Sequence, residues 1–358
     1  IRARWGIPAS MDTAMETALR SPCADWQRGT EATRPAHLQI DAAAFHDAFD
    51  REPFTFSHNL SGLPLFFDGA LRNLANRYDA HPRDYYVAAG APSAGSEFFA
   101  VPNGLCKPSA AMDQLQTHSI RLLLKRPENH DPAFRTLLDE QFKEVMALRG
   151  GLRGERLVRL ESAVFITSAA STTPFHFDPE IGFFSQIEGE KIYHVYSPSA
   201  LRETVLEKFY LQGLTSIGQV ELKACDPALE HIYKLGPGIG FHQPQNAPHW
   251  VETRASRSVS YAFVFETDVS RHRGQARACN HYMRKLGFDP FAPGRRPAVD
   301  EVKAAAMRML IPVRKRVGAT LKAMRGNQLR RHGIPLAPGA AHRQVIHPAG
   351  VTATSRRK

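Results

Sequence analysis

Short apolar stretches separated by turns dominate the chain between residues 160 and 268. Segments such as ESAVFITS, GFFSQI, KIYHVY and SVSYAFVFET are rich in β-branched and aromatic residues, and Gly, Pro or polar residues divide them. Many short strands at this spacing are typical of an all-β sandwich or barrel. The pattern therefore predicts a mainly β core, with the helix-like stretch 201–213 as an insertion between two strands.

Helical periodicity is found on both sides of this core. Residues 69–78 and 132–152 repeat apolar positions every three or four residues, as amphipathic helices do. Residues 297–310 begin with proline and acidic residues, which are helix-start signals. We predict a loosely ordered segment over 1–35, a mainly helical region over 36–159, the β domain over 160–268, a C-terminal helical region over 269–335 and a disordered basic tail over 336–358.

Composition and charge restrict the class of protein. The 358 residues are 43% hydrophobic and 23% charged, which is typical of a globular chain with a sizeable core. The net charge is +11, but thirteen Lys and Arg residues and no acidic residue follow Glu301. The preceding residues are therefore close to neutral. Nucleic acid or an acidic partner is one reading of the basic end, and a helix packed on the body or on a second copy is the favoured one.

Membrane, secretory and disulfide-stabilised classes receive no support. No run of about 18 apolar residues occurs, so we expect no membrane span. The first twenty residues contain charges throughout and lack the apolar stretch of a secretory signal. The four cysteines are far apart in the sequence and form no CxxC pair. This spacing argues against a zinc ribbon and fits a reducing compartment, so we expect a cytoplasmic protein.

One histidine and one aspartate suggest a metal site. His176 and Asp178 are two residues apart in the stretch TPFHFD. On an extended strand, residues i and i+2 project from the same face, so both side chains point toward one spot. A second histidine from a distant strand would complete a 2-His-1-carboxylate triad, which leaves coordination positions open on Fe(II). The tripeptide alone is a weak signal, because a hydrogen-bonded surface histidine would give the same pattern.

The third ligand is sought in the stretch GFHQPQNAPHWVET. His249 stands just after a Pro/Asn turn and starts an apolar strand, so it is the favoured partner. His242 precedes a proline and is a weaker candidate for the rim of the site. His194 and His231 have no comparable sequence context.

Lys191 is the candidate for binding an anion beside such a metal. The Glu188-Gly189 pair predicts a tight hairpin turn, after which the strand with Lys191 would run back next to the metal ligands. A buried lysine is costly unless its ammonium group meets an anion. A dicarboxylate held to the metal at one end would supply that anion, and the Thr173 hydroxyl is placed to donate to it. Without the triad, an exposed strand lysine is the simpler interpretation.

These segments together resemble a known family. The order T-P-x-H-x-D, then FF-x-QI-x-G, then a lysine fifteen residues after the histidine, is similar to the JmjC/cupin-like Fe(II)/2-oxoglutarate oxygenases. Among these enzymes, the sequence is similar to the asparaginyl hydroxylase that inhibits hypoxia-inducible factor. The distal GPG, Pro244 and His249 match in the same order. The resemblance covers residues 160–268 and implies a double-stranded β-helix, or jelly roll, flanked by N- and C-terminal helices.

The resemblance also implies roles for individual residues. His176, Asp178 and His249 would bind Fe(II), and Thr173 and Lys191 would bind the distal carboxylate of the cosubstrate 2-oxoglutarate. O2 would be consumed, and a C–H bond of a peptide, protein side chain or amino-acid-like substrate would be hydroxylated. The sequence departs from the family at Gly182, where the asparaginyl hydroxylase carries an amide. No tyrosine for a second 2-oxoglutarate contact is evident in FITSAAS.

Other functions remain open at this level. A cupin enzyme that needs no 2-oxoglutarate would keep the triad but would have no use for Lys191. A non-enzymatic regulator would use the β domain as a sensor and the basic tail to bind nucleic acid. Lysine demethylation would use the same chemistry, but no chromatin-reading motif accompanies it. The family's C-terminal dimerisation helices imply a homodimer. Gln186 is expected either to line the site or to form a core amide bonded to the backbone.

Overall fold

A computed structural model describes residues 36–90, 92–98, 106–211 and 217–310. The segment 1–35, the tail 336–358 and the part of the predicted C-terminal helical region after residue 310 lie outside these ranges.

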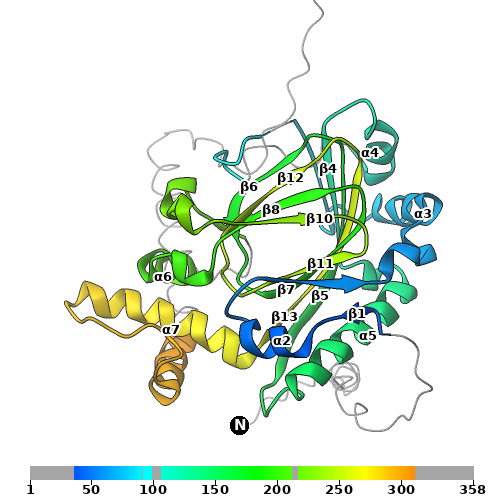
Figure 1. The fold of residues 1–358 in the computed structure, drawn as a ribbon. Coiled ribbons are helices and arrows are strands. Elements are labelled where there is room, and N and C mark those ends of the chain that lie inside the picture. The colour runs from blue at the N-terminus through cyan, green and yellow to red at the C-terminus, as the bar shows by residue number, and fades with distance from the viewer. Residues whose placement is uncertain (1–35, 91, 99–105, 212–216, 311–358) are drawn as a thin grey trace, which may run out of the picture. The chain divides into compact units, whose positions relative to one another are not determined.

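Two antiparallel sheets face each other in the described part of the chain (Figure 1). In spatial order, the larger sheet holds β1 (Leu38–Gln39), β2 (Phe54–His58), β11 (Ile239–Gln243), β7 (Ile181–Glu188), β13 (Ser258–Thr267), β5 (Leu157–Thr167), β4 (Ile120–Lys125) and β3 (Tyr85–Ala89). The smaller sheet holds β10 (His231–Leu235), β8 (Lys191–Val195), β12 (His249–Thr253), β6 (Thr172–Phe177) and β9 (Gly218–Gln219).

The chain crosses repeatedly between the sheets. Strands β5, β7, β11 and β13 belong to the larger sheet, while β6, β8, β10 and β12 belong to the smaller one. Eight strands shared in this way between two facing antiparallel sheets form a jelly roll. The predicted β core with flanking helices is therefore confirmed.

Alternation along the strands determines what each face of the larger sheet contacts. In β13, Val259, Tyr261, Phe263 and Phe265 belong to one buried apolar cluster with residues of α3 (Asp68–Tyr78) and α5 (Pro132–Arg149). The intervening residues of β13 face the smaller sheet. Because successive side chains of a strand point to opposite faces, one face is covered by helices and the other lines the interior between the sheets.

The region before residue 160 contributes strands as well as helices. It contains α2 (Ala42–Ala48), α3, α4 (Pro108–Gln114) and α5, and also β1 to β4, which extend the larger sheet. In β4 the run Leu122 to Leu124 is apolar without alternation, so periodicity does not separate a strand from a helix there. The domain boundary at residue 160 remains a prediction, and β5 starts at Leu157.

Helices also follow and interrupt the jelly roll. The predicted insertion is α6 (Glu203–Leu211), between β8 and β9, and it lies beside α7 (Asp268–Lys285) (Figure 1). Arg277 of α7 pairs with Glu203 of α6, with a distance of 3.0 Å between Nε and Oε2. Residues 297–310 are helical, as predicted. Short 3-10 turns occupy Leu60–Gly62, Pro64–Phe66, Pro127–Asn129, Pro198–Ala200, Leu222–Ala224 and Pro227–Leu229.

None of the helices in the described ranges combines the length and the apolar character needed to cross a bilayer.

Candidate metal centre

Three predicted ligands meet inside the jelly roll. His176 lies on β6 and His249 opens β12, and the two residues are paired across the smaller sheet. Asp178 follows the end of β6. The candidate ligand atoms of the three side chains all lie within 4.8 Å of one another. Among the described residues, no other group of His, Cys, Asp and Glu side chains gathers in this way.

Both histidines present the same ring nitrogen to the site. Their Nδ1 atoms lie 2.7 Å from the carbonyl oxygen of Pro174 and 3.0 Å from that of Ala247, for His176 and His249 respectively. A carbonyl only accepts, so each Nδ1 carries the proton and each Nε2 keeps a free lone pair. Such hydrogen bonds orient the rings of metal-binding histidines.

Burial keeps both rings neutral. Burial, together with a smaller contribution from the nearby His249, lowers the pKa of His176 to about 3, and the carboxylate of Asp178 opposes the shift. Burial also lowers the pKa of His249, again against the carboxylate of Asp178. Neutral imidazole is the form that binds a metal, so neither ring has to lose a proton first near neutral pH.

Asp178 is held by two contacts from the loop and strand before His249. Its backbone oxygen accepts from the Asn246 N–H at 2.8 Å, and its Oδ2 accepts from Gln243 Nε2 at 2.9 Å. Gln243 was not among the site residues predicted from the sequence. The available signal was its place next to His242 in the stretch GFHQ, since neighbours on a strand point to opposite faces. Gln243 also lies opposite Gly182 in the sheet, so an amide reaches the site from the neighbouring strand.

The other histidines do not join the triad. His242 points to the helix-covered face, where its Nδ1 donates to the Gly182 carbonyl at 3.0 Å and its Nε2 accepts from the Asp50 N–H at 3.0 Å. It is therefore part of the packing and does not line the rim of the site. His194 lies on the outer face of β8 and stacks on Trp250, with ring centroids 3.7 Å apart. His231 is exposed at the start of β10.

The predicted hairpin before Lys191 is wrong. The strand β8 pairs with β12 and β10, whereas β7 pairs with β11 and β13 in the opposite sheet. The Glu188-Gly189 turn therefore carries the chain from one sheet to the other. Gly189 has φ +70°, and a Cβ there would lie 2.2 Å from the carbonyl oxygen of Arg257. Lys191 still lies beside a ligand-bearing strand, because it pairs with Thr253 of β12.

Lys191 is a buried cation without an acidic partner. Its side chain is 5% exposed, and its Nζ lies 5.3 Å from the ring centre of Phe184 and 5.6 Å from that of Phe165. No acidic group of the described residues forms an ion pair with it, and burial alone lowers its pKa to about 7. An uncompensated buried charge is costly, so this position favours an anionic ligand.

A β-bulge brings Thr173 to the same face as His176. On a regular strand, residues three apart would point to opposite faces. Here His249 pairs with His176 and Val251 pairs with Thr173, so three steps on β6 match two steps on β12. Val251 belongs to the interior apolar cluster, and cross-strand partners share a face. Thr173 therefore faces the interior between the sheets.

Gln186 is a core amide. Its Nε2 donates to the Glu188 carbonyl at 2.7 Å and to Ser258 Oγ at 2.8 Å, while its Oε1 accepts from Ser260 Oγ at 2.8 Å. The second of the two interpretations from the sequence is thus the observed one. Aromatic side chains complete the surroundings of the triad: Phe98 lies 4.7 Å from the His176 ring, centroid to centroid. Tyr193 stacks on His249 at 6.0 Å.

Comparisons with known proteins give structural neighbours only. No model of a known protein family matches the sequence, and no curated protein is similar to it. A structure of the Escherichia coli ribosomal oxygenase YcfD superposes with a TM-score of 0.45 at 16% identity, covering 78% of this chain and 68% of that chain.

Two further structures of that protein are similar. One, in complex with cobalt and 2-oxoglutarate, gives a TM-score of 0.44 at 14% identity. The other, in complex with cobalt and succinic acid, gives 0.42 at 16% identity. Each covers 77% of this chain and 68% of that chain.

Proposed function

We propose that this protein is a JmjC/cupin-like oxygenase that uses Fe(II) and 2-oxoglutarate to hydroxylate a C–H bond. His176, Asp178 and His249 would bind the iron, and Lys191 and Thr173 would bind the distal carboxylate of 2-oxoglutarate. The observation that carries the proposal is a His-Asp-His triad with two buried histidines, combined in the same interior with a buried lysine that has no acidic partner among the described residues.

The donor set fits a catalytic iron. Two neutral imidazoles and one carboxylate form the facial triad of non-haem Fe(II) oxygenases, which leaves positions for a chelating cosubstrate and O2. All three donors come from adjacent strands of one sheet or from the end of one of them. The ion would therefore be bound from one side, and its other side would face the interior between the sheets.

Lys191 distinguishes this proposal from a cupin enzyme that needs no 2-oxoglutarate. Such an enzyme would need the triad alone. The Lys191 amine contacts two phenylalanine rings and has no acidic partner among the described residues, so it favours a carboxylate ligand. Thr173 faces the same interior and would donate its hydroxyl to that carboxylate.

The residues of this chain would orient the iron ligands and keep water away from the reacting groups. When bound, iron and 2-oxoglutarate activate O2, so that 2-oxoglutarate becomes succinate and CO2 and one oxygen atom enters a C–H bond. Pro174 and Ala247 fix the two histidine rings through their carbonyls, and Gln243 fixes Asp178. Phe98 and Tyr193 pack against the rings and limit the access of water.

A peptide, a protein side chain or an amino-acid-like molecule is the proposed substrate class.

The three cysteines in the described residues, Cys106, Cys225 and Cys279, are free thiols, which is consistent with the cytoplasmic location that we propose.

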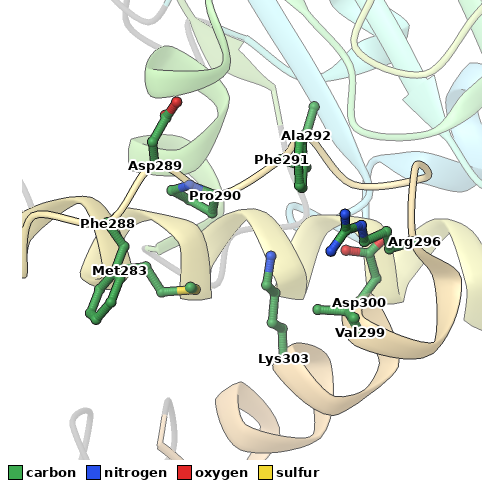
Figure 2. Close-up of a pocket in the computed structure, with 10 residues that line it drawn as sticks. All are labelled: Met283, Phe288, Asp289, Pro290, Phe291, Ala292, Arg296, Val299, Asp300 and Lys303. Atoms are coloured by element: carbon green, nitrogen blue, oxygen red, sulfur yellow. The ribbon is translucent and has the colours of Figure 1, made fainter.

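We also propose that a second copy of this chain packs against the C-terminal helices. A pocket of about 250 Å³ lies beside α7 and the helix 297–310, and Figure 2 shows the residues that line it, among them the apolar Met283 and Phe288. Within the pair of helices, Lys303 Nζ donates to Asn280 Oδ1 at 2.8 Å. Large apolar side chains of this region are exposed, among them Leu286, Phe288, Val302 and Met309. A second copy that covers these side chains would remove their apolar surface from water.

The dimer is tested by sedimentation of the full chain. Val302→Glu places a charge in the exposed apolar surface and is expected to convert a dimer into a monomer without changing metal binding. The control Glu301→Gln changes the charge at the neighbouring exposed position and is expected to leave the dimer intact. A wild-type chain that sediments as a monomer at all concentrations would contradict this part of the proposal.

The oxygenase activity is tested by following 2-oxoglutarate turnover. The purified chain with Fe(II), ascorbate and O2 should release labelled CO2 from [1-¹⁴C]-2-oxoglutarate slowly without substrate, and faster when a substrate is present. His249→Ala should abolish the release. Iron binding without any CO2 release from the wild-type chain, in the presence of peptide and amino-acid pools, would favour the 2-oxoglutarate-independent alternative.

The alternative of a nucleic-acid-binding regulator depends on the basic end of the chain, and the part of it after residue 310 lies outside the described residues. It predicts DNA or RNA binding that weakens steeply as salt rises.

A further inference from the structure

Arg121 projects from the larger sheet into the interior that contains the metal site. It lies on β4, where its neighbours Leu122 and Leu124 belong to the apolar cluster under the helices. The alternation of Leu122 and Leu124 indicates that this cluster lies on one face of β4, so Arg121 points to the opposite face. Its partner across the sheet is Thr167 of β5, and cross-strand partners share a face.

Hydroxyl groups connect this position to the sheet that carries Lys191. Thr167 Oγ1 lies 3.1 Å from Thr253 Oγ1, and Ser171 Oγ donates to Thr253 Oγ1 at 3.2 Å. Thr253 in turn pairs with Lys191. Arg121 and Lys191 therefore approach the same interior from the two opposite sheets.

Arg121 is buried without a partner for its charge. The residue is 7% exposed, and its Nε and Nη2 atoms are buried without a hydrogen-bond partner in the described residues. No acidic group in the described parts of the chain forms an ion pair with it. Burial lowers its pKa, and the Tyr86 side chain acts in the opposite direction. Its positive charge also lowers the pKa of His176, by less than burial and His249 do. Arg121 therefore lies within electrostatic reach of the triad.

A guanidinium in this state is most simply explained by a ligand that the interior accepts. Leaving donors of a buried charged group unsatisfied costs more than leaving those of a neutral group. Arginine binds carboxylates through two parallel hydrogen bonds, and the two unpartnered nitrogens, Nε and Nη2, lie on one edge of the guanidinium fork.

We propose that Arg121 binds a carboxylate of 2-oxoglutarate, as a second anion-binding residue opposite Lys191. This inference rests on the proposed function and adds a cosubstrate contact that the resemblance does not supply. 2-Oxoglutarate has two carboxylates, one next to the keto group and one at the distal end. Arg121 and Lys191, on opposite sheets, would either bind one carboxylate each or bind the distal carboxylate together. The two arrangements predict different affinities for an analogue that lacks the distal carboxylate.

The experiment compares two ligands on three forms of the Fe(II)-loaded chain under anaerobic conditions. The ligands are 2-oxoglutarate and 2-oxopentanoate, which has a methyl group in place of the distal carboxylate. The forms are wild type, Arg121→Gln and Lys125→Gln. Lys125 lies on the same strand and the same face, four residues from Arg121, and is a matched control for loss of a positive charge.

Arg121→Gln is expected to weaken 2-oxoglutarate binding about 10- to 100-fold, since hydrogen bonds to charged groups have this size, while Lys125→Gln leaves it unchanged. Equal weakening for both ligands would assign Arg121 to the carboxylate next to the keto group. Weakening for 2-oxoglutarate alone would assign it to the distal carboxylate, together with Lys191. Unchanged affinity for both ligands would overturn the inference.

Thermal unfolding separates a ligand-binding role from a structural one. Without ligand, Arg121→Gln should unfold at the same temperature as wild type or higher, because it removes an unpaired buried charge. A clearly lower unfolding temperature would indicate that Arg121 stabilises the fold, and would overturn the assignment. If the wild-type chain binds Fe(II) but neither ligand, it is the proposed function that fails, and this outcome is distinct from the failure of Arg121 alone.

Discussion

The metal triad and the two buried cations differ in the partners that the protein provides for their polar atoms. Each residue of the triad has a second partner: Pro174 for His176, Ala247 for His249 and Gln243 for Asp178. Lys191 and Arg121 are equally buried, but neither has an acidic partner in the described residues.

This difference indicates which part of the site is complete before ligands bind. The ligand atoms of the triad are fixed by hydrogen bonds that remain when a metal arrives, so the protein orients them in advance. On the proposed function, the two cations would reduce the stability of the ligand-free fold and would be satisfied when an anion enters. The triad would then receive an ion, and the opposite part of the interior would receive a negatively charged molecule.

The largest effect is expected at the triad. His176→Ala or His249→Ala removes one of three protein ligands and should abolish tight Fe(II) or Co(II) binding, as measured by titration calorimetry. The control His194→Gln changes a histidine on the outer face of β8 and should leave metal binding unchanged. Equal losses for His194→Gln and His249→Ala would mean that the triad does not bind the metal.

Lys191→Met should separate stability from cosubstrate binding. The variant removes an unpaired buried ammonium, so the unfolding temperature of the ligand-free chain should rise. Its affinity for 2-oxoglutarate should fall about 100-fold, because a charge-assisted contact is lost. Metal affinity should stay the same. A variant that is less stable than wild type without ligand would show that Lys191 has a structural partner.

Gln243→Leu is expected to weaken the metal site moderately. The amide donates to Asp178 at 2.9 Å, and loss of such a supporting contact typically reduces metal affinity about 10- to 100-fold. The matched control Gln245→Leu removes an amide that donates to the Pro179 carbonyl at 2.8 Å and to none of the three ligand side chains. Similar metal affinities for the two variants would contradict the role of Gln243.

The smallest effect is a pH dependence of 2-oxoglutarate binding. Burial lowers the pKa of Lys191 from 10.5 to about 7. Below pH 7 the amine is charged and ready for a carboxylate. Above pH 7 it must take up a proton on binding, so the affinity should fall by up to about tenfold per pH unit. Calorimetry in buffers with different ionisation enthalpies measures this proton uptake, which should disappear in Lys191→Met.

The same shift makes the ligand-free fold more stable at alkaline pH. Between pH 7 and the unfolded value of 10.5, the unfolded chain binds more protons at Lys191 than the native chain does. The free energy of unfolding from this group therefore rises with pH in that window, and below pH 7 its burial penalty is fully present. Lys191→Met should lack this rise.

Local patterns predicted the triad because strand alternation and the order of motifs along the chain both point to it. His176 and His249 lie on strands that are recognisable in the sequence, and the jelly roll pairs these strands. The hairpin at Gly189 was predicted wrongly because a tight turn looks the same whether the chain pairs back or crosses to another sheet. That choice depends on long-range pairing, which periodicity does not report.

The supporting residues were harder to predict for the same reason. Gln243 and Arg121 lie on strands 65 and 57 residues away from Asp178 in the sequence, on either side of it. Nothing in their immediate neighbours indicates a shared site. The position of Thr173 depends on a bulge in β6, which changes the face of every residue before it. Such features follow from sheet register.

The measurement that tests the central claim most directly is an anaerobic titration of the chain with Fe(II) and 2-oxoglutarate, followed by visible absorption. Chelation of Fe(II) by a 2-oxo acid produces a weak charge-transfer band, so the account predicts that the band appears in the wild-type chain and weakens strongly in Lys191→Met at the same ligand concentration. Iron that is bound without any band, at saturating 2-oxoglutarate, would contradict the account.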